Sequence, residues 1–134
     1  VWYVQYAHAR VCSVMGRAAE AGFEAGDSAL AAADLARLED PSELALAKKI
    51  AEFPRLVEGA AQAREPHRIA FYLYDLASEF HAHWNRGQDR PELRLIREED
   101  AALTLARLAL ARAAGVVISA GLGILGVTPL TELK

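Results

Sequence analysis

Tyr6, His8 and Arg10 are the first residues with distinctive chemistry in a chain that is otherwise rich in Leu and Ala. Tyr6 and Arg10 are four positions apart, so on a helix their side chains project together, whereas His8 points elsewhere. A ring beside a guanidinium can stack on an unpaired base and contact a phosphate or a carbonyl. Because such pairs occur in many helices that only pack, the spacing alone favours a structural role.

A second group of polar rings lies on a helix predicted over residues 66–87, between an apolar stripe and a charged stripe. The group is His67, Tyr74, Ser78, His81 and Asn85. The apolar stripe, predicted to face the core, is Ile69, Leu73, Leu76, Phe80 and Trp84, and the charged stripe, predicted to face water, is Arg68, Asp75, Glu79 and Arg86. Base rates favour a helix–helix contact for the polar rings; the functional alternative is a surface that binds unstacked bases.

The sequence carries no pattern typical of a catalytic or metal site. His81 and His83 are two positions apart, so on a helix they point apart and do not form a metal pair without an outside ligand. A phosphate-binding loop, a dinucleotide fingerprint and a nucleophile elbow are all missing from the sequence. We therefore predict no catalytic residue, no metal ligand and no cofactor in this chain.

The bulk composition predicts an ordinary globular domain. With 134 residues, 53% hydrophobic, 25% charged and a formal net charge of −3, the chain can bury one core, and its charge indicates no particular partner. Cys12 is the single cysteine, so no intrachain disulfide can form. The sequence begins without Met and without a signal-peptide pattern, from which we expect a piece of a longer protein.

Helical periodicity, interrupted by prolines and glycines, predicts helices over 2–21, 28–39, 41–52, 53–64, 66–87 and about 98–122, and no strand. Asp40, Pro41 and Glu43 form a helix start with a capping box, and Pro54 is expected to break or kink the chain. The three acids at 98–100 are placed in the first turn of the last helix, where its dipole favours them.

The last helix is apolar nearly all round, which is typical of the centre of a bundle. Its most apolar run, residues 115–127, is too short to span a bilayer, so a buried core helix is the better interpretation. The predicted fold is therefore all-α, a single-domain bundle of about five helices.

Three segments, "YVQYAHARVCSV", "ALAKKIAEFPRLVEGAAQAREPHRIAFYLYDLASEFHAHWN" and "LTLARLALARAAGVVISAGLGILGV", resemble in content and order the C-terminal anticodon-binding (DALR) domain of bacterial arginyl-tRNA synthetase. The likeness covers nearly the whole chain, and its first segment is the most specific. It implies that residues 1–134 form one domain. It implies the fold of class I synthetase anticodon-binding domains and a parent enzyme that attaches arginine to its tRNA. The signatures of the catalytic domain of that family are missing, so the chain alone is expected to catalyse nothing.

The resemblance also implies a tRNA-binding site. Tyr6 and Arg10 match family positions that lie against the anticodon loop, and Trp84 and Asn85 fall in the family pattern "FHxFYN", where Trp84 replaces a tyrosine. Leu133, followed by Lys134, matches a family position near the anticodon that often holds Met. The implied partners are arginine tRNA and the catalytic domain of the same enzyme, in a monomeric cytoplasmic protein without a membrane, and ATP and magnesium belong to that catalytic domain.

Two alternatives to this assignment remain open at the level of sequence. One is the related domain of the glycyl-tRNA synthetase β subunit, against which the "YAHAR" segment argues. The other is a structural or protein-interaction bundle whose ring-bearing stripe meets a partner helix, which the acidic net charge favours.

Overall fold

The computed structural model describes residues 1–132 as a bundle of helices, with no strand among them. The five longer helices are α1 (Trp2–Glu20), α3 (Pro41–Ala51), α4 (Phe53–Ala63), α5 (His67–Asp89) and α6 (Ala101–Ile124). A short helix, α2 (Asp27–Ala31), and two 3-10 turns, η1 (Leu35–Arg37) and η2 (Pro91–Leu93), lie in the connections. The predicted all-α bundle of about five helices is therefore confirmed.

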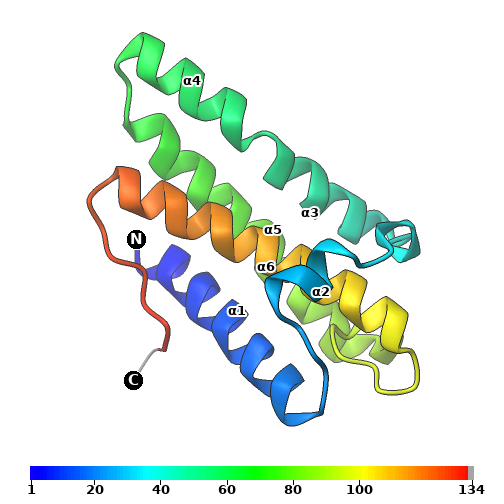
Figure 1. The fold of residues 1–134 in the computed structure, drawn as a ribbon. Coiled ribbons are helices and arrows are strands. Elements are labelled where there is room, and N and C mark those ends of the chain that lie inside the picture. The colour runs from blue at the N-terminus through cyan, green and yellow to red at the C-terminus, as the bar shows by residue number, and fades with distance from the viewer. Residues whose placement is uncertain (133–134) are drawn as a thin grey trace.

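Helices α1, α5 and α6 pack side by side, and α3 and α4 follow one another along the outer side of α5 (Figure 1). The approach of α6 to its neighbours is close, because two glycines face side chains there. A Cβ added to Gly121 would lie 2.7 Å from a methyl carbon of Leu73 on α5, and one added to Gly115 would lie 2.9 Å from a methyl carbon of Val11 on α1. These two positions let α6 approach α1 and α5 more closely than a side chain would permit.

Helix α6 is the core helix that its composition predicts. By length and composition it could cross a membrane, yet half of its most apolar window is buried inside the fold. It contacts α1, α2, α3 and α5, and several of its residues are buried, namely Ala106, Leu108, Ala111, Ala114, Ile118 and Leu122.

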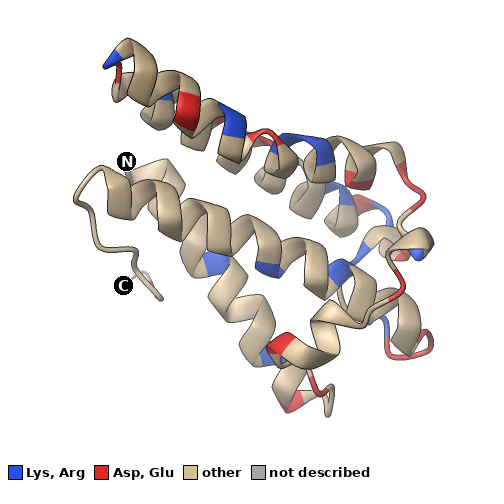
Figure 2. Cartoon of the chain, turned by 45° about the horizontal axis from the view of Figure 1, so that its top comes forward, with Lys and Arg blue, Asp and Glu red and all other residues tan. Residues whose placement is uncertain are grey.

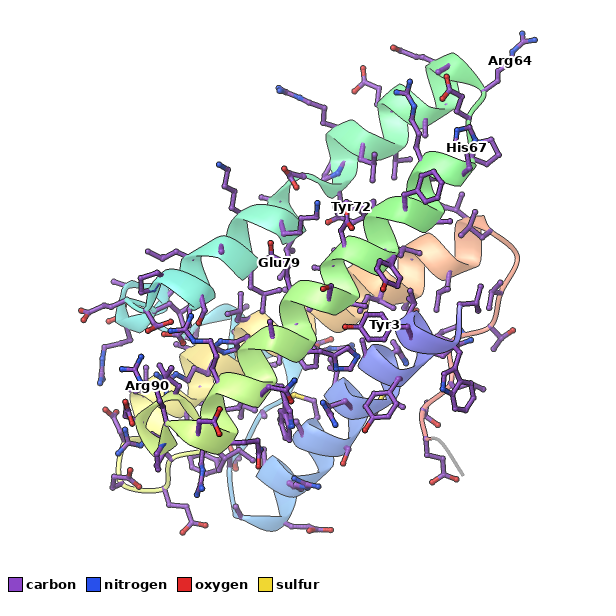
Figure 3. The ribbon with its side chains drawn as sticks, turned by 180° about the vertical axis from the view of Figure 1, so that it is seen from behind. Tyr3, Arg64, His67, Tyr72, Glu79 and Arg90 are labelled. Carbon is purple, nitrogen blue, oxygen red and sulfur yellow. The ribbon has the colours of Figure 1, made fainter. Side chains whose placement is uncertain are left out.

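The turn into α3 and the step from α3 to α4 follow the sequence signals closely. The side chain of Asp40 accepts a hydrogen bond from the Ser42 amide at 2.9 Å. The side chain of Glu43 accepts one from the Asp40 amide at 3.3 Å, which completes the capping box. Helix α3 ends before Pro54, and α4 begins at Phe53. Tyr72 of α5 (Figure 3) links this helix to the end of α3, because its hydroxyl donates a hydrogen bond to the Lys49 carbonyl.

Three predicted boundaries were wrong. The segment 28–39 holds only α2 and η1, because Asp34 caps a 3-10 turn by accepting from the Ala36 amide. Helix α5 continues beyond Gly87 to Asp89, and this glycine serves packing instead, since a Cβ there would lie 3.3 Å from the Arg94 backbone. The acids at 98 and 99 precede α6, which Asp100 caps by accepting from the Leu103 amide.

A buried ion pair links α3, α6 and the segment that follows α5. Arg107 Nε donates to Glu43 Oε2 at 2.8 Å, and the two side chains are 5% and 1% exposed. Arg107 Nη1 also donates to the carbonyls of Glu92 at 2.8 Å and Arg94 at 2.9 Å. One buried guanidinium thus satisfies a carboxylate and two backbone acceptors, which is the condition for tolerating a charge in a core.

Arg107→Met should lower the free energy of unfolding by about 3 to 5 kcal/mol, because it leaves Glu43 buried without its counter-charge. Arg112→Met on the same helix is the matched control. Arg112 is half exposed and lies 3.5 Å from exposed Asp27, so its loss should cost less than about 1 kcal/mol. Urea denaturation measures both values, and equal losses would contradict a structural role for the buried pair.

Candidate nucleic-acid interface

The guanidinium of Arg10 lies between two aromatic rings. Its Cζ is 4.7 Å from the ring centroid of Tyr6 and 4.9 Å from that of Trp84, and Nη2 donates to the Tyr6 hydroxyl at 2.8 Å. Tyr6 is 40% exposed, while Arg10 and Trp84 are half-buried. The predicted projection of Tyr6 and Arg10 to one side of α1 is confirmed, and the cation joins α1 to α5 through cation–π contacts.

His81 of α5 also contacts Arg10 and Tyr6. Its Nδ1 lies 3.3 Å from Arg10 Nη1, and its ring centroid is 4.8 Å from that of Tyr3 and 5.2 Å from that of Tyr6. Figure 3 shows Tyr3 where α1 meets α5. Burial, with a smaller contribution from the Arg10 charge, lowers the pKa of His81, so the ring is neutral near pH 7. Since Arg10 can only donate, Nδ1 is the acceptor and we assign the ring proton to Nε2.

We call Tyr6, Arg10, His81 and Trp84 the Arg10 cluster. Arg17, two turns after Arg10 on α1, extends it, because its Cζ lies 6.0 Å from the Trp84 ring. The guanidinium of Arg10 is engaged with both rings and with His81, so its first role is to orient the rings.

The chain after α6 turns back and runs beside the start of α1 (Figure 1). Gln5 holds it with both ends of its amide, because Nε2 donates to the Thr128 carbonyl at 2.9 Å and Oε1 accepts from the Leu130 amide at 2.8 Å. His8 Nδ1 lies 2.6 Å from the Leu130 carbonyl. The two polar residues that point away from the Arg10 cluster therefore fix the C-terminal segment.

This segment completes a hollow next to the Arg10 cluster. The hollow has a volume of about 500 Å³ and is lined by Tyr6, Ala9, Arg10, Cys12, Ser13, Arg17, Trp84, Thr131 and Glu132. A smaller hollow that also borders Tyr6 is lined by Trp2, Tyr3, Tyr6, Arg10, His81 and Asn85. Tyr6 and Arg10 thus border both hollows, with Trp84 in one and Asn85 in the other. The remaining candidate, Leu133, lies outside the described residues.

The other members of the polar-ring group do not join the cluster. Tyr74 and Ser78 are exposed, and Tyr74 packs on Tyr3 with ring centroids 5.0 Å apart. His67 lies at the start of α5 near Arg64, away from Tyr3 (Figure 3), and contacts Glu65. Of the predicted apolar stripe, Trp84 is half-buried at the margin of the core, whereas the other four members are buried.

Charge around the interface is local and not global. Lys and Arg alternate with Asp and Glu over α3, α4 and α5, whereas the end of α6 carries no charge (Figure 2). In the segment after α6, residues 125–131 are uncharged and Glu132 follows them. Positive charge beside the larger hollow comes from Arg10 and Arg17, and Glu132 adds a carboxylate to the same lining. A polyanion would therefore meet a small basic spot beside rings, not a basic face.

Sequence reasoning missed Arg17 and Gln5, and it did not connect His81 with Arg10. Arg17 could have been found, because positions 10 and 17 lie on one helical face two turns apart. His81 was noted, but its contact with Arg10 depends on how α1 crosses α5. Gln5 carried no signal, since its partners are more than 120 positions away in the chain.

An all-helical domain with rings and a guanidinium clustered between α1 and α5 fits one known class of protein, the helical anticodon-binding domains. The family model of the DALR anticodon binding domain matches residues 4–133, so the chain belongs to this family of helical domains. Within it, the chain is of the type found in arginyl-tRNA synthetases.

The relatives supporting this assignment are arginine–tRNA ligases. The chain is 63% identical to that of Paracoccus denitrificans and 62% identical to that of Ruegeria pomeroyi, in each case over all of this chain and 23% of the relative. The Thermus thermophilus arginyl-tRNA synthetase structure superimposes with a TM-score of 0.76 and 32% identity, over 98% of this chain and 21% of that one. These matches favour the arginyl-tRNA synthetase family over the glycyl-tRNA synthetase β subunit.

The chain spans about a quarter of the length of these relatives. It corresponds to the anticodon-binding domain of such enzymes. Within residues 1–132, no group of three or more His, Cys, Asp or Glu residues is placed so that it could hold a metal ion.

Gln5→Ala should release the C-terminal segment while the bundle stays folded. The change removes two hydrogen bonds of roughly 0.5 to 1.5 kcal/mol each, so the Leu130 amide should exchange with solvent about tenfold faster or more. Hydrogen exchange followed by NMR measures this rate. Ser13→Ala, an exposed change on the same helix, should leave it unchanged. Unchanged protection of Leu130 in the Gln5 variant would show that other contacts hold the segment.

Proposed function

We propose that this domain binds the anticodon loop of arginine tRNA at the Arg10 cluster and its two hollows. The observation that carries the proposal is the placement of the Tyr6 and Trp84 rings on either side of one guanidinium, beside the larger hollow. Sequence-specific RNA readout generally targets single-stranded loops, whose unstacked bases pack on aromatic rings and arginine planes. The membership in an anticodon-binding family supports the same target.

Each residue has a distinct role in this proposal. Tyr6 and Trp84 supply faces on which loop bases stack, and Arg10 keeps the two rings in register while its charge attracts the backbone. Asn85, exposed at the edge of the smaller hollow, can donate to and accept from the edge of a base. Leu133 is proposed to add an apolar contact from the C-terminal end of the chain.

The wider context is proposed on the same basis. A catalytic domain elsewhere in a longer enzyme would attach arginine to the tRNA with ATP and magnesium, and this domain would contact that domain as well as the anticodon loop. We propose a monomeric enzyme that acts in the cytoplasm and needs no membrane. Residues 1–134 then form its one anticodon-binding domain.

The proposal is tested by titrating the chain with arginine tRNA and with the same tRNA carrying a swapped anticodon, at two salt concentrations. We expect tighter binding to the native anticodon, because base contacts carry sequence information. Affinity for both RNAs should fall as salt rises, because phosphate contacts release counterions.

Equal binding to both RNAs would reduce the domain to a nonspecific RNA surface. If the folded chain bound neither RNA, the proposal that it reads the anticodon by itself would be wrong. Binding of a protein partner that was insensitive to salt would then favour the interaction-bundle alternative.

Tyr6→Ala should weaken binding of arginine tRNA about tenfold or more, because stacking of one base is worth ~1 to 3 kcal/mol. The matched control is Phe71→Ala on α5, where the ring is 66% exposed and borders neither hollow. Fluorescence titration gives the affinities, and thermal melting shows whether each variant is folded. A large loss of stability in the Tyr6 variant, with unchanged affinity of the folded fraction, would assign Tyr6 to packing.

A further inference from the structure

The second half of α6 has an outward face without any charged residue. Residues 113–131 contain no Lys, Arg, Asp or Glu. In this run, Val116 and Ile124 are 48% and 53% exposed. They share one side of the helix with apolar residues that are exposed or half-buried, and we call this set the α6 outer face: Ala113, Val116, Val117, Ala120, Gly123 and Ile124. Exposed apolar residues gathered on one face indicate an interaction surface, whereas single ones do not.

Among residues 1–132, no helix covers the α6 outer face. The elements that pack on the outside of α6 lie nearer its start, where Arg37 of η1 contacts Asp100 and Asp27 of α2 contacts Arg112. In Figure 1 the second half of α6, drawn in orange, has no helix in front of it. A Cβ built on Gly123 would meet no atom of another element within 4 Å. The face is therefore open in this domain.

The α6 outer face and the Arg10 cluster lie on different sides of the bundle. Helices α1, α5 and α6 pack side by side, and the Arg10 cluster lies between α1 and α5. Figure 3, drawn from behind Figure 1, shows Tyr3 where α1 meets α5, and in this view α6 lies behind α5. A partner bound to the α6 outer face would therefore leave the Arg10 cluster free to bind RNA.

The composition of the face favours a protein partner over a nucleic acid. RNA binding depends on Lys and Arg side chains that neutralise phosphates, and the α6 outer face has neither. The core of a stable protein interface, by contrast, is depleted in charged residues and rich in apolar ones. At the rise of an α-helix, residues 113–124 extend over roughly 17 Å, which is long enough for several turns of a partner helix.

The remaining part of a parent enzyme is the partner that the observations favour. The chain spans about a quarter of the length of its relatives, so in an enzyme of that kind most of the sequence lies outside residues 1–134. The start of α1 lies near the end of α6, because Gln5 holds the segment that follows α6. Val1 is 72% exposed at this end of the bundle. Chain that precedes Val1 in a parent enzyme would therefore enter at the end where the α6 outer face lies.

We propose that the α6 outer face packs against the part of the parent enzyme that contains the catalytic domain, with Val116 and Ile124 in the core of the interface. The inference rests on the proposed function, which places this domain in a longer synthetase, and it identifies the surface through which the two parts meet. Such a contact fixes the Arg10 cluster in position relative to the catalytic domain while the cluster stays open to the anticodon loop.

The test compares the isolated chain with the full-length enzyme by hydroxyl-radical footprinting, which labels side chains that water reaches. Val116 and Ile124 should be labelled about fivefold less in the full-length enzyme, because their exposed fractions would fall from 48% and 53% to those of an interface core. Leu44 on α3 is 54% exposed and is the matched control, which should be labelled equally in both proteins. Arginine tRNA added to the isolated chain should not change the labelling of Val116 and Ile124.

Ile124→Glu and Leu44→Glu form a matched pair of substitutions. Each places a carboxylate at an exposed position of the isolated chain, so both variants of that chain should melt and bind arginine tRNA like the unsubstituted chain. In the full-length enzyme, only Ile124→Glu should restore the labelling of Val116. The same variant should lower kcat/KM for arginylation of the tRNA about tenfold or more, because burial of an unpaired carboxylate is unfavourable.

The outcomes distinguish this inference from the proposed function. Equal labelling of Val116 and Ile124 in the isolated chain and the full-length enzyme would overturn the inference and leave the proposed function standing. Protection of the face in the isolated chain would also overturn it, since a dimer in sedimentation would identify a second copy as the occupant, and protection by tRNA would identify RNA. If the full-length enzyme protects the face but the folded chain binds no tRNA, the proposed function fails and the docking surface stands.

Discussion

The buried contact between Arg107 and Glu43 is the constraint on which the arrangement of this domain depends. Glu43 belongs to the capping box that starts α3, and Arg107 comes from the middle of α6. The same guanidinium reaches two carbonyls of the segment after α5. Helix α3, helix α6 and the segment after α5 are therefore held together at one point. The buried charge is tolerated only when all of these partners are in place.

This point also connects the core to the interface. The carbonyl of Arg94 that accepts from Arg107 belongs to a residue that, with Trp84, lines a pocket of about 310 Å³. On the other side of Trp84, the Arg10 cluster joins α1 to α5 through rings and a cation. The Arg10 cluster therefore lies where two helices meet, and irregular chain forms the C-terminal border of the larger hollow. Such support keeps the rings oriented before a ligand arrives, which reduces the ordering cost of binding.

The features that sequence predicted well are those determined within a few residues. The capping box at Asp40, the break at Pro54 and the shared direction of Tyr6 and Arg10 depend only on helix geometry and local hydrogen bonds. The predictions failed where tertiary contacts decided the outcome. Gly87 resembles a helix stop, yet it lies inside α5 because a neighbouring backbone approaches it closely. The contacts of His81 and Gln5 depend on partners from distant segments, which no local pattern encodes.

The clamp formed by Gln5 also has a consequence for the order in which the domain is completed. Within this domain α1 is synthesised first. The side-chain amide of Gln5 has no hydrogen-bond partners until Thr128 and Leu130 are made, more than 120 residues later. Until this C-terminal segment has been made, the larger hollow beside α1 lacks one of its walls. A partly synthesised chain can therefore pack its core before it can present a finished surface to RNA, so the binding site is the last part of the domain to be built.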